Sequence, residues 1–91
     1  MGTRKRPFNE DGIKGLPDDK PVVYEIQTAG GNPNYIGSAK RGRVKARLGE
    51  HLGEIPGAKV KIKQFSSISD AQKAEQRAIK SKQPPRNKQG T

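Results

Sequence analysis

Cysteine and tryptophan are both missing from the 91 residues of this chain, and histidine occurs only once. Without cysteine, the chain can form no disulfide, has no catalytic thiol and cannot bind zinc or iron–sulfur clusters through sulfur. A single histidine also excludes the usual multi-histidine metal sites. Apolar residues make up 29% of the chain and form no run longer than the segment around Val22-Val23, so we expect neither a membrane span nor a signal peptide. We therefore expect a soluble, cytoplasmic protein with one small domain.

Acidic residues are scarce beside basic ones, since nineteen Lys and Arg stand against nine Asp and Glu and give a net charge of +10. The whole excess lies in residues 40–91, which hold fourteen bases and four acids, because residues 1–39 hold five of each. Basic residues gathered in one part of a chain are typical of a protein that binds an anionic partner. We favour nucleic acid over a membrane surface, since no amphipathic stretch carries large apolar anchors. A merely solvated basic surface is the alternative.

Residues 1–20 show no sustained periodicity of either kind, and we expect a flexible arm of mixed charge there. Phe8, Ile13 and Leu16 could attach part of this arm to the body of the protein. Residues 21–87 are expected to form the domain, and residues 88–91 a frayed tail.

Alternation of apolar and polar residues predicts three strands. The first two, over 21–27 and 34–38, are joined by a loop rich in Gly, Asn and Pro, which indicates a hairpin. The third, over 58–65, has an apolar side and a side of three lysines, namely Lys59, Lys61 and Lys63. We interpret these lysines as protection of a sheet edge rather than as a binding surface.

Two segments have the period of a helix. Val44, Leu48 and Leu52 recur at every fourth position, which predicts a helix over about 41–52. Ser69 followed by Gln72 is a capping-box pattern, and it predicts a second helix that runs to about residue 81. The predicted fold is therefore α+β, a small three-stranded antiparallel sheet flanked by helices in the order β-β-α-β-α.

The general enzyme motifs are absent, since the sequence has no P-loop, GxGxxG, HExxH or GxSxG. One ordered series of residues remains, and it comprises Val23-Tyr24, Tyr35-Ile36-Gly37-Ser38, Arg47-x-x-x-His51, Glu75 and Pro84-Pro85-Arg86-Asn87. Over residues 21–87 this series resembles the GIY-YIG nuclease family. The second signature of the family name, Tyr-Ile-Gly, matches Tyr35-Ile36-Gly37 in full. The first signature, Gly-Ile-Tyr, is replaced by Val22-Val23-Tyr24, which keeps the tyrosine.

The resemblance implies metal-dependent hydrolysis of a phosphodiester bond in one strand of nucleic acid, by a DNA endonuclease with a single active site. Glu75 is then the single protein ligand of Mg²⁺ or Mn²⁺, whose remaining ligands are water and phosphate oxygens. Arg47 stabilises the charge of the five-coordinate phosphate, which its planar guanidinium suits.

The other family positions imply roles around the attacking water. Tyr24 is the general base or orients the water, and Tyr35 lies beside it. His51 forms a hydrogen bond with a tyrosine hydroxyl or with the nucleophile, and Asn87 supports the phosphate or the metal region. Taken alone, each of these residues would more often have a structural role, such as a core aromatic, a helix-end histidine or a solvated polar side chain.

The basic residues near Arg47 have two expected effects. Lys40, Arg41, Arg43 and Lys45 are expected to make nonspecific contacts with phosphates. A phenol ionises only near pH 10, and cations lower that pKa. We therefore expect Arg47, the lysines and the metal to lower the pKa of Tyr24 and to favour activity at mildly alkaline pH.

Two other functions compete with the nuclease. One is a nucleic-acid-binding module that keeps the fold with weak or no activity, and the other is a basic structural protein of a ribonucleoprotein. The expected partner is nucleic acid, with DNA favoured and no membrane involved. Base-specific readout is not visible, so either the structure of the DNA or a targeting protein is expected to direct the domain to its site. Cleavage of both strands of a duplex would need a homodimer or two encounters. A bacterial version would associate with the nucleoid.

Overall fold

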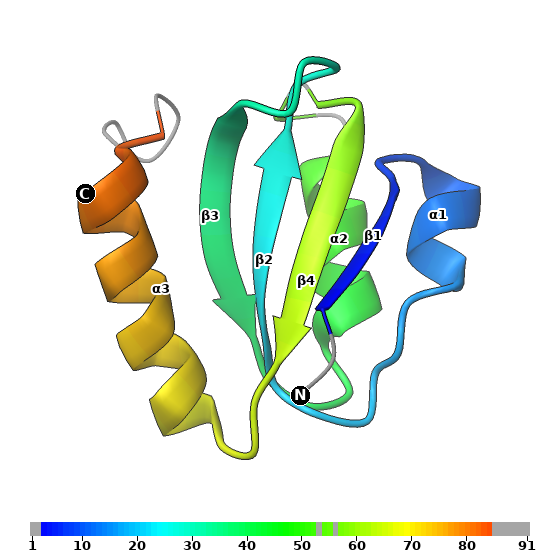
Figure 1. Cartoon of the computed structure of the whole chain (residues 1–91). Helices are drawn as coiled ribbons and strands as arrows, with labels where there is room; N and C mark the ends of the chain where they lie inside the picture. Colours follow the sequence, from blue (N-terminus) through cyan, green and yellow to red (C-terminus); the bar gives the residue numbers. More distant parts are fainter. Residues whose placement is uncertain (1–2, 53, 56, 85–91) are drawn as a thin grey trace.

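The computed structural model describes residues 3–52, 54–55 and 57–84, and it contains four strands and three helices (Figure 1). In chain order the elements are β1 (Thr3–Pro7), α1 (Glu10–Lys14), β2 (Val22–Gln27), β3 (Pro33–Ala39), α2 (Val44–His51), β4 (Lys59–Gln64) and α3 (Ile68–Lys82). The fold is α+β, as predicted. No helix within these residues is long and apolar enough to cross a membrane.

The strands form one antiparallel sheet in the order β1-β4-β2-β3. The predicted hairpin is confirmed as β2 and β3, with Tyr24 opposite Gly37. Alternation decides the two faces, because Val22, Tyr24 and Ile26 point into one hydrophobic core together with residues of α1, α2 and β4. Helix α3 packs against β3 and β2.

The predicted number of strands is wrong by one, because the expected arm contains both β1 and α1. Strand β1 has the sequence Thr-Arg-Lys-Arg-Pro, which carries no apolar alternation. It pairs with β4 through the backbone, and backbone pairing leaves no pattern in the side chains. Phe8, Ile13 and Leu16 are buried in the core, as the sequence allowed.

The N-terminal region also stabilises the start of α2 through two hydrogen bonds. The carboxylate of Asp18 accepts a hydrogen bond of 2.8 Å from the backbone N–H of Val44, and its carbonyl accepts one of 2.8 Å from Gly42. Gly42 has φ of +80°, a conformation that other residues adopt only with strain. Since the Arg43 side chain makes no capping bond, Asp18 acts as the cap of α2 from outside the helix.

The two predicted helices exist with shifted ends. Val44 and Leu48 are fully buried on α2, which confirms its apolar stripe. Helix α3 begins at Ile68, and its cap is Ser67, whose hydroxyl accepts from the backbone N–H of Asp70 at 3.2 Å. The capping box assigned to Ser69 is therefore wrong by two residues, because Ser67 already caps the helix and Ser69 lies inside its first turn.

Candidate active site

Tyr24 lies at the centre of the site, and its side chain is fully buried. The ring extends from β2 across the neighbouring strand β3 at Gly37. A Cβ atom on Gly37 would lie 2.5 Å from the Tyr24 hydroxyl oxygen and 2.6 Å from the ring carbon that bears it. Gly37 is therefore required for the close approach of Tyr24, which agrees with the second signature of the sequence.

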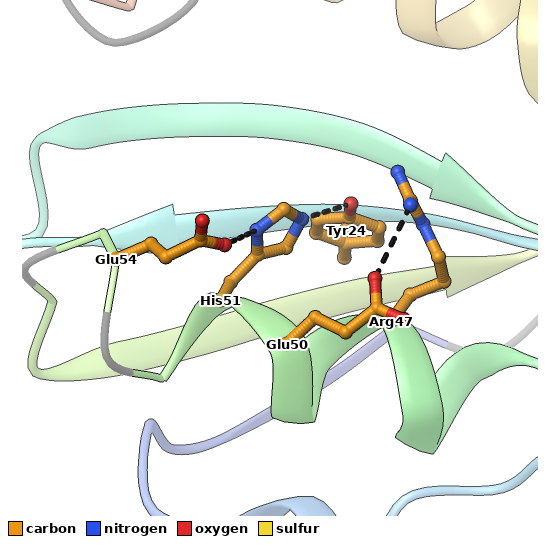
Figure 2. A network of polar contacts seen from close by, with 5 residues as sticks. All are labelled: Tyr24, Arg47, Glu50, His51 and Glu54. Carbon is orange, nitrogen blue, oxygen red and sulfur yellow. Dashed lines mark hydrogen bonds and ion pairs between the residues drawn. The ribbon is translucent and has the colours of Figure 1, made fainter.

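Two other rings surround the Tyr24 hydroxyl. His51 Nε2 lies 2.9 Å from this oxygen, in a buried hydrogen bond between α2 and β2 (Figure 2). The ring of Tyr35 lies 6.2 Å from the ring of Tyr24 and 5.0 Å from that of His51, centroid to centroid. The two tyrosines and the histidine of the sequence-based prediction thus form one aromatic cluster.

Arg47 lies one turn before His51 on α2, and Figure 2 shows both side chains rising from the helix with the Tyr24 ring between them. Its guanidinium is close enough to the Tyr24 hydroxyl to lower the pKa of that group. It also lies 3.4 Å from the carboxylate of Glu50. Both partners of that ion pair are substantially exposed, so it holds Arg47 only weakly.

Glu75 joins the site from α3. One of its carboxylate oxygens accepts a hydrogen bond of 2.6 Å from the Ser38 hydroxyl on β3. Ser38 and Arg47 line the same cavity of about 460 Å³, which lies between the end of β3, the start of α2 and the start of α3. Glu75 is half-buried and exerts a charge effect on Tyr24, so it belongs to the same constellation.

Burial raises the pKa of the Tyr24 hydroxyl well above its usual value of 10, and the neighbouring Tyr35 adds to this effect. Arg47 lowers the pKa, but its effect is smaller than that of burial. The expectation of a lowered Tyr24 pKa is therefore wrong, although Arg47 acts in the expected direction. Desolvation has a larger effect on this pKa than Arg47 does, because the phenolate would lie in the core, where charge is poorly solvated.

Burial also lowers the pKa of His51 below 6.5, and the charge of Arg47 acts in the same direction. The imidazole is therefore neutral at pH 7. Its Nδ1 is buried without a hydrogen-bond partner in the described part of the chain, and a Glu54 carboxylate oxygen lies 4.0 Å away. A proton on Nδ1 would leave Nε2 free to accept from Tyr24.

The expected phosphate contacts divide into two groups. Lys40 and Arg43 line the same cavity as Arg47. Arg41 instead lines a different cavity, next to Lys20 and Phe65. Lys45 is exposed on α2. The structure thus brings only part of the predicted basic segment to the site.

Glu75 is the side chain that could hold a metal ion. Within residues 3–52, 54–55 and 57–84, no three His, Cys, Asp or Glu side chains come together as a metal site. A carboxylate with a hydroxyl beside it, at the rim of an open cavity, suits a hard cation that takes most of its ligands from water and phosphate. It does not suit zinc or another metal that needs several protein ligands.

Two further residues need comment, one that the sequence did not predict and one that it did. Ser38 directly follows the second signature, but nothing in its neighbourhood along the chain indicates a contact with a glutamate 37 positions later. That contact arises only when α3 packs against β3. Asn87, predicted to support the phosphate, lies outside the described residues.

Neither a scan against protein-family models nor a search of curated proteins finds a match for this chain.

Proposed function

We propose that this protein is a divalent-metal-dependent endonuclease of the GIY-YIG type that hydrolyses phosphodiester bonds of DNA. The observation that carries the proposal is the gathering of four polar side chains from three elements. Tyr24 of β2 lies with His51 and Arg47 of α2. Glu75 of α3, bound to Ser38 on β3, also acts on Tyr24 through its charge. A basic structural protein would have no need for a buried tyrosine–histidine pair beside an arginine-lined cavity. The family name rests on the order of these residues in the sequence.

The raised pKa of Tyr24 decides how a water molecule could be activated. A phenolate base is disfavoured, whereas a neutral phenol can accept a proton from water while it passes its own proton to Nε2 of His51. Because burial and Arg47 also lower the pKa of His51, the imidazolium formed in this step is short-lived. The water oxygen bonds to phosphorus, the bond to the leaving oxygen breaks, and that oxygen takes a proton from solvent. His51 then carries the transferred proton until it returns it to water.

Arg47 and Glu75 have separate tasks in this proposal. The guanidinium of Arg47 lies beside the cavity, where it would donate to oxygens of the phosphate as negative charge develops. Glu75 would hold Mg²⁺ or Mn²⁺, and a bound cation of this kind polarises a phosphoryl oxygen. Ser38 fixes the rotamer of Glu75 through its hydrogen bond.

A binding module with this fold and weak or no activity is the second candidate. The burial of Tyr24 favours it, because a raised phenol pKa opposes the simplest form of base catalysis. The presence of Arg47 in the cavity and of Glu75 on its neighbour Ser38 favours the nuclease instead.

The test is cleavage of end-labelled single-stranded, duplex and branched DNA, each with Mg²⁺, Mn²⁺ or a chelator. Glu75→Ala protein purified in parallel controls for contaminating nucleases. We expect products that need the metal and disappear with Glu75→Ala. Salt-sensitive binding without cleavage under any metal would instead establish the binding module.

A further inference from the structure

The face of the sheet that looks away from α2 carries a group of basic side chains. Alternation places Val60 and Ile62 in the core, so the lysines between and beside them point the other way. Strand β1 adds one more, since Lys5 pairs with Lys61 in the register of the two strands. We call this group the lysine face, and it consists of Lys5, Lys59, Lys61 and Lys63.

The lysine face does not protect an edge of the sheet. Strand β4 lies between β1 and β2, so the interpretation drawn from the sequence is wrong for its three lysines. Two lysines directly opposite one another on neighbouring strands repel and destabilise the sheet. Glu25 lies opposite Lys61 on β2 and offsets part of the repulsion between Lys61 and Lys5. An anionic partner would offset more of it, for Lys5, Lys59 and Lys63 as well.

A groove continues the lysine face toward α3. It has a volume of about 370 Å³, and Lys61 and Lys63 line it from β4 while Arg77 and Lys82 line it from α3. Glu25 is the acidic residue among the groove's lining, and it is 7% exposed and bound to Lys82 Nζ at 2.6 Å. With that carboxylate paired, the accessible charge of the groove is positive.

Helix α3 separates this groove from the cavity of the candidate active site. Ile68 and Gln72 line the active-site cavity, whereas Arg77 and Ala78 line the groove. The two basic regions are thus distinct surfaces on either side of one helix.

We propose that the lysine face and its groove bind the phosphate backbone of a nucleic-acid strand, as a second contact apart from the cleavage site. The lysines of β4 recur every second residue, or about 6.7 Å, an interval comparable with that between successive phosphates on one strand. Ammonium groups of this kind act as point charges that need no fixed angle to a phosphate. Binding at this surface does not involve the active site. The proposal therefore holds even if the protein has no cleavage activity.

The composition of the surface argues against a membrane as its partner. An interfacial surface needs large apolar side chains that enter the acyl region. Among the groove residues, Phe65 is the single aromatic one, and it is half-buried with the Lys63 ammonium 5.7 Å from its ring centre. Charge without apolar anchors suits a polyanion better than a bilayer.

The experiment measures affinity for a fluorescent 20-nucleotide single strand and for its duplex, with a chelator present to prevent cleavage, over a range of salt concentrations. The variant Lys61→Gln/Lys63→Gln is compared with Lys14→Gln/Lys20→Gln, which has the same net charge but changes lysines outside the lysine face. Because each lost phosphate contact lowers the logarithmic salt slope by about 0.7 for a single strand and 0.9 for a duplex, we expect the first variant to lose about 1.4 or 1.8 from it. The control should retain the slope of the unchanged protein.

Two results would overturn the proposal. One is a slope for Lys61→Gln/Lys63→Gln that equals the control with both probes. The other concerns phosphatidylserine vesicles, whose binding is measured in the same buffers. It is a Lys61→Gln/Lys63→Gln protein that keeps wild-type affinity for DNA but no longer binds these vesicles. If the double variant does not fold, the exposed Arg77→Gln replaces it, with an expected loss of about 0.7 or 0.9. Cleavage with Glu75→Ala is tested separately, so failure of this proposal and failure of the nuclease proposal are distinguishable.

Discussion

At the scale of single residues, the Tyr24 hydroxyl makes the sharpest distinction between a structural and a catalytic role. Tyr24→Phe keeps the buried ring but removes the hydrogen bond to His51. We expect the free energy of unfolding to fall by about 1 kcal/mol, whereas the cleavage rate falls by about 100-fold or more because the proton relay is lost. Urea unfolding and single-turnover cleavage measure the two effects. Cleavage at the wild-type rate would show that this hydroxyl takes no part in the chemistry.

His51 gives a dependence on pH whose sign follows from its burial. Because burial and Arg47 lower its pKa in the folded protein, the neutral imidazole stabilises the fold above the unfolded value of about 6.5. That contribution is lost as pH falls through the lowered folded value. We expect His51→Gln to show a weaker loss of stability than the wild type between about pH 7 and 5, measured by urea unfolding. Equal pH profiles for the two proteins would contradict this origin of the acid sensitivity.

The order of residues in the sequence led us to expect Tyr24, Tyr35 and His51 near one another, and the structure brings their rings together. Their chemical roles stay predictions. Burial was not predictable in the same way. The pKa of Tyr24 depends on how completely α2 covers β2, and the sequence alone led to the opposite sign. The contact between Ser38 and Glu75 likewise depends on tertiary packing between distant segments.

At the scale of elements, the approach of β2 to β3 depends on one glycine. Gly37→Ala places a methyl group against the Tyr24 hydroxyl and ring, and we expect a loss of stability of about 1–3 kcal/mol together with weaker cleavage. Gly49→Ala is the matched control, because a Cβ at Gly49 on α2 meets no atom within 4 Å. There we expect a gain of up to about 1 kcal/mol from helix propensity. Thermal unfolding of Gly37→Ala and Gly49→Ala measures both changes in stability. Equal changes in the two variants would contradict the close contact between Gly37 and Tyr24.

The pairing of Glu25 with Lys82 connects β2 to the end of α3. Burial opposes ionisation of Glu25, but hydrogen bonds from Lys82 and Gln27 and the charges of Lys82 and Lys61 lower its pKa below 4.5. Its ionised form therefore stabilises the fold above the unfolded pKa, and this contribution is lost as pH falls through the lowered value. Since Lys82 is 41% exposed, we expect Glu25→Gln to cost only about 1 kcal/mol at neutral pH.

Urea unfolding of Glu25→Gln and the wild type at neutral and acidic pH tests this expectation. The difference between the two proteins should shrink as the pH is lowered. A difference that stays constant down to acid pH would show that the amide perturbs packing rather than charge.

The elements themselves were predictable to different degrees. The strands β2, β3 and β4 follow from alternation, and α2 from its apolar stripe, because each buries one face against the core. Strand β1 could not be predicted, since its polar residues serve backbone pairing with β4. Its position also changes the meaning of the lysines on β4, which the sequence alone places at an edge.

At the scale of the whole molecule, basic side chains gather on two surfaces on either side of α3. One surface holds the candidate active site, and the other holds the lysine face. One active site cuts one strand at a time, so a duplex would be nicked unless two molecules act on it. In our proposal, this arrangement joins a small catalytic cavity to a wider phosphate-binding surface within one domain.

The most direct measurement is the single-turnover rate of DNA cleavage by Glu75→Gln, beside Glu50→Gln and the wild type at saturating Mg²⁺. Glutamine at position 75 keeps the shape and an oxygen that can accept from Ser38, but it removes the negative charge proposed to hold the metal. Glu50→Gln changes the net charge by the same amount as Glu75→Gln. Glu50 lies on α2 and contacts Arg47 only through an exposed ion pair, which holds that arginine weakly. We expect Glu75→Gln to reduce the rate by about 100-fold or more and Glu50→Gln to leave it within a few-fold of wild type. Equal rates for all three proteins would contradict a metal-dependent active site at Glu75.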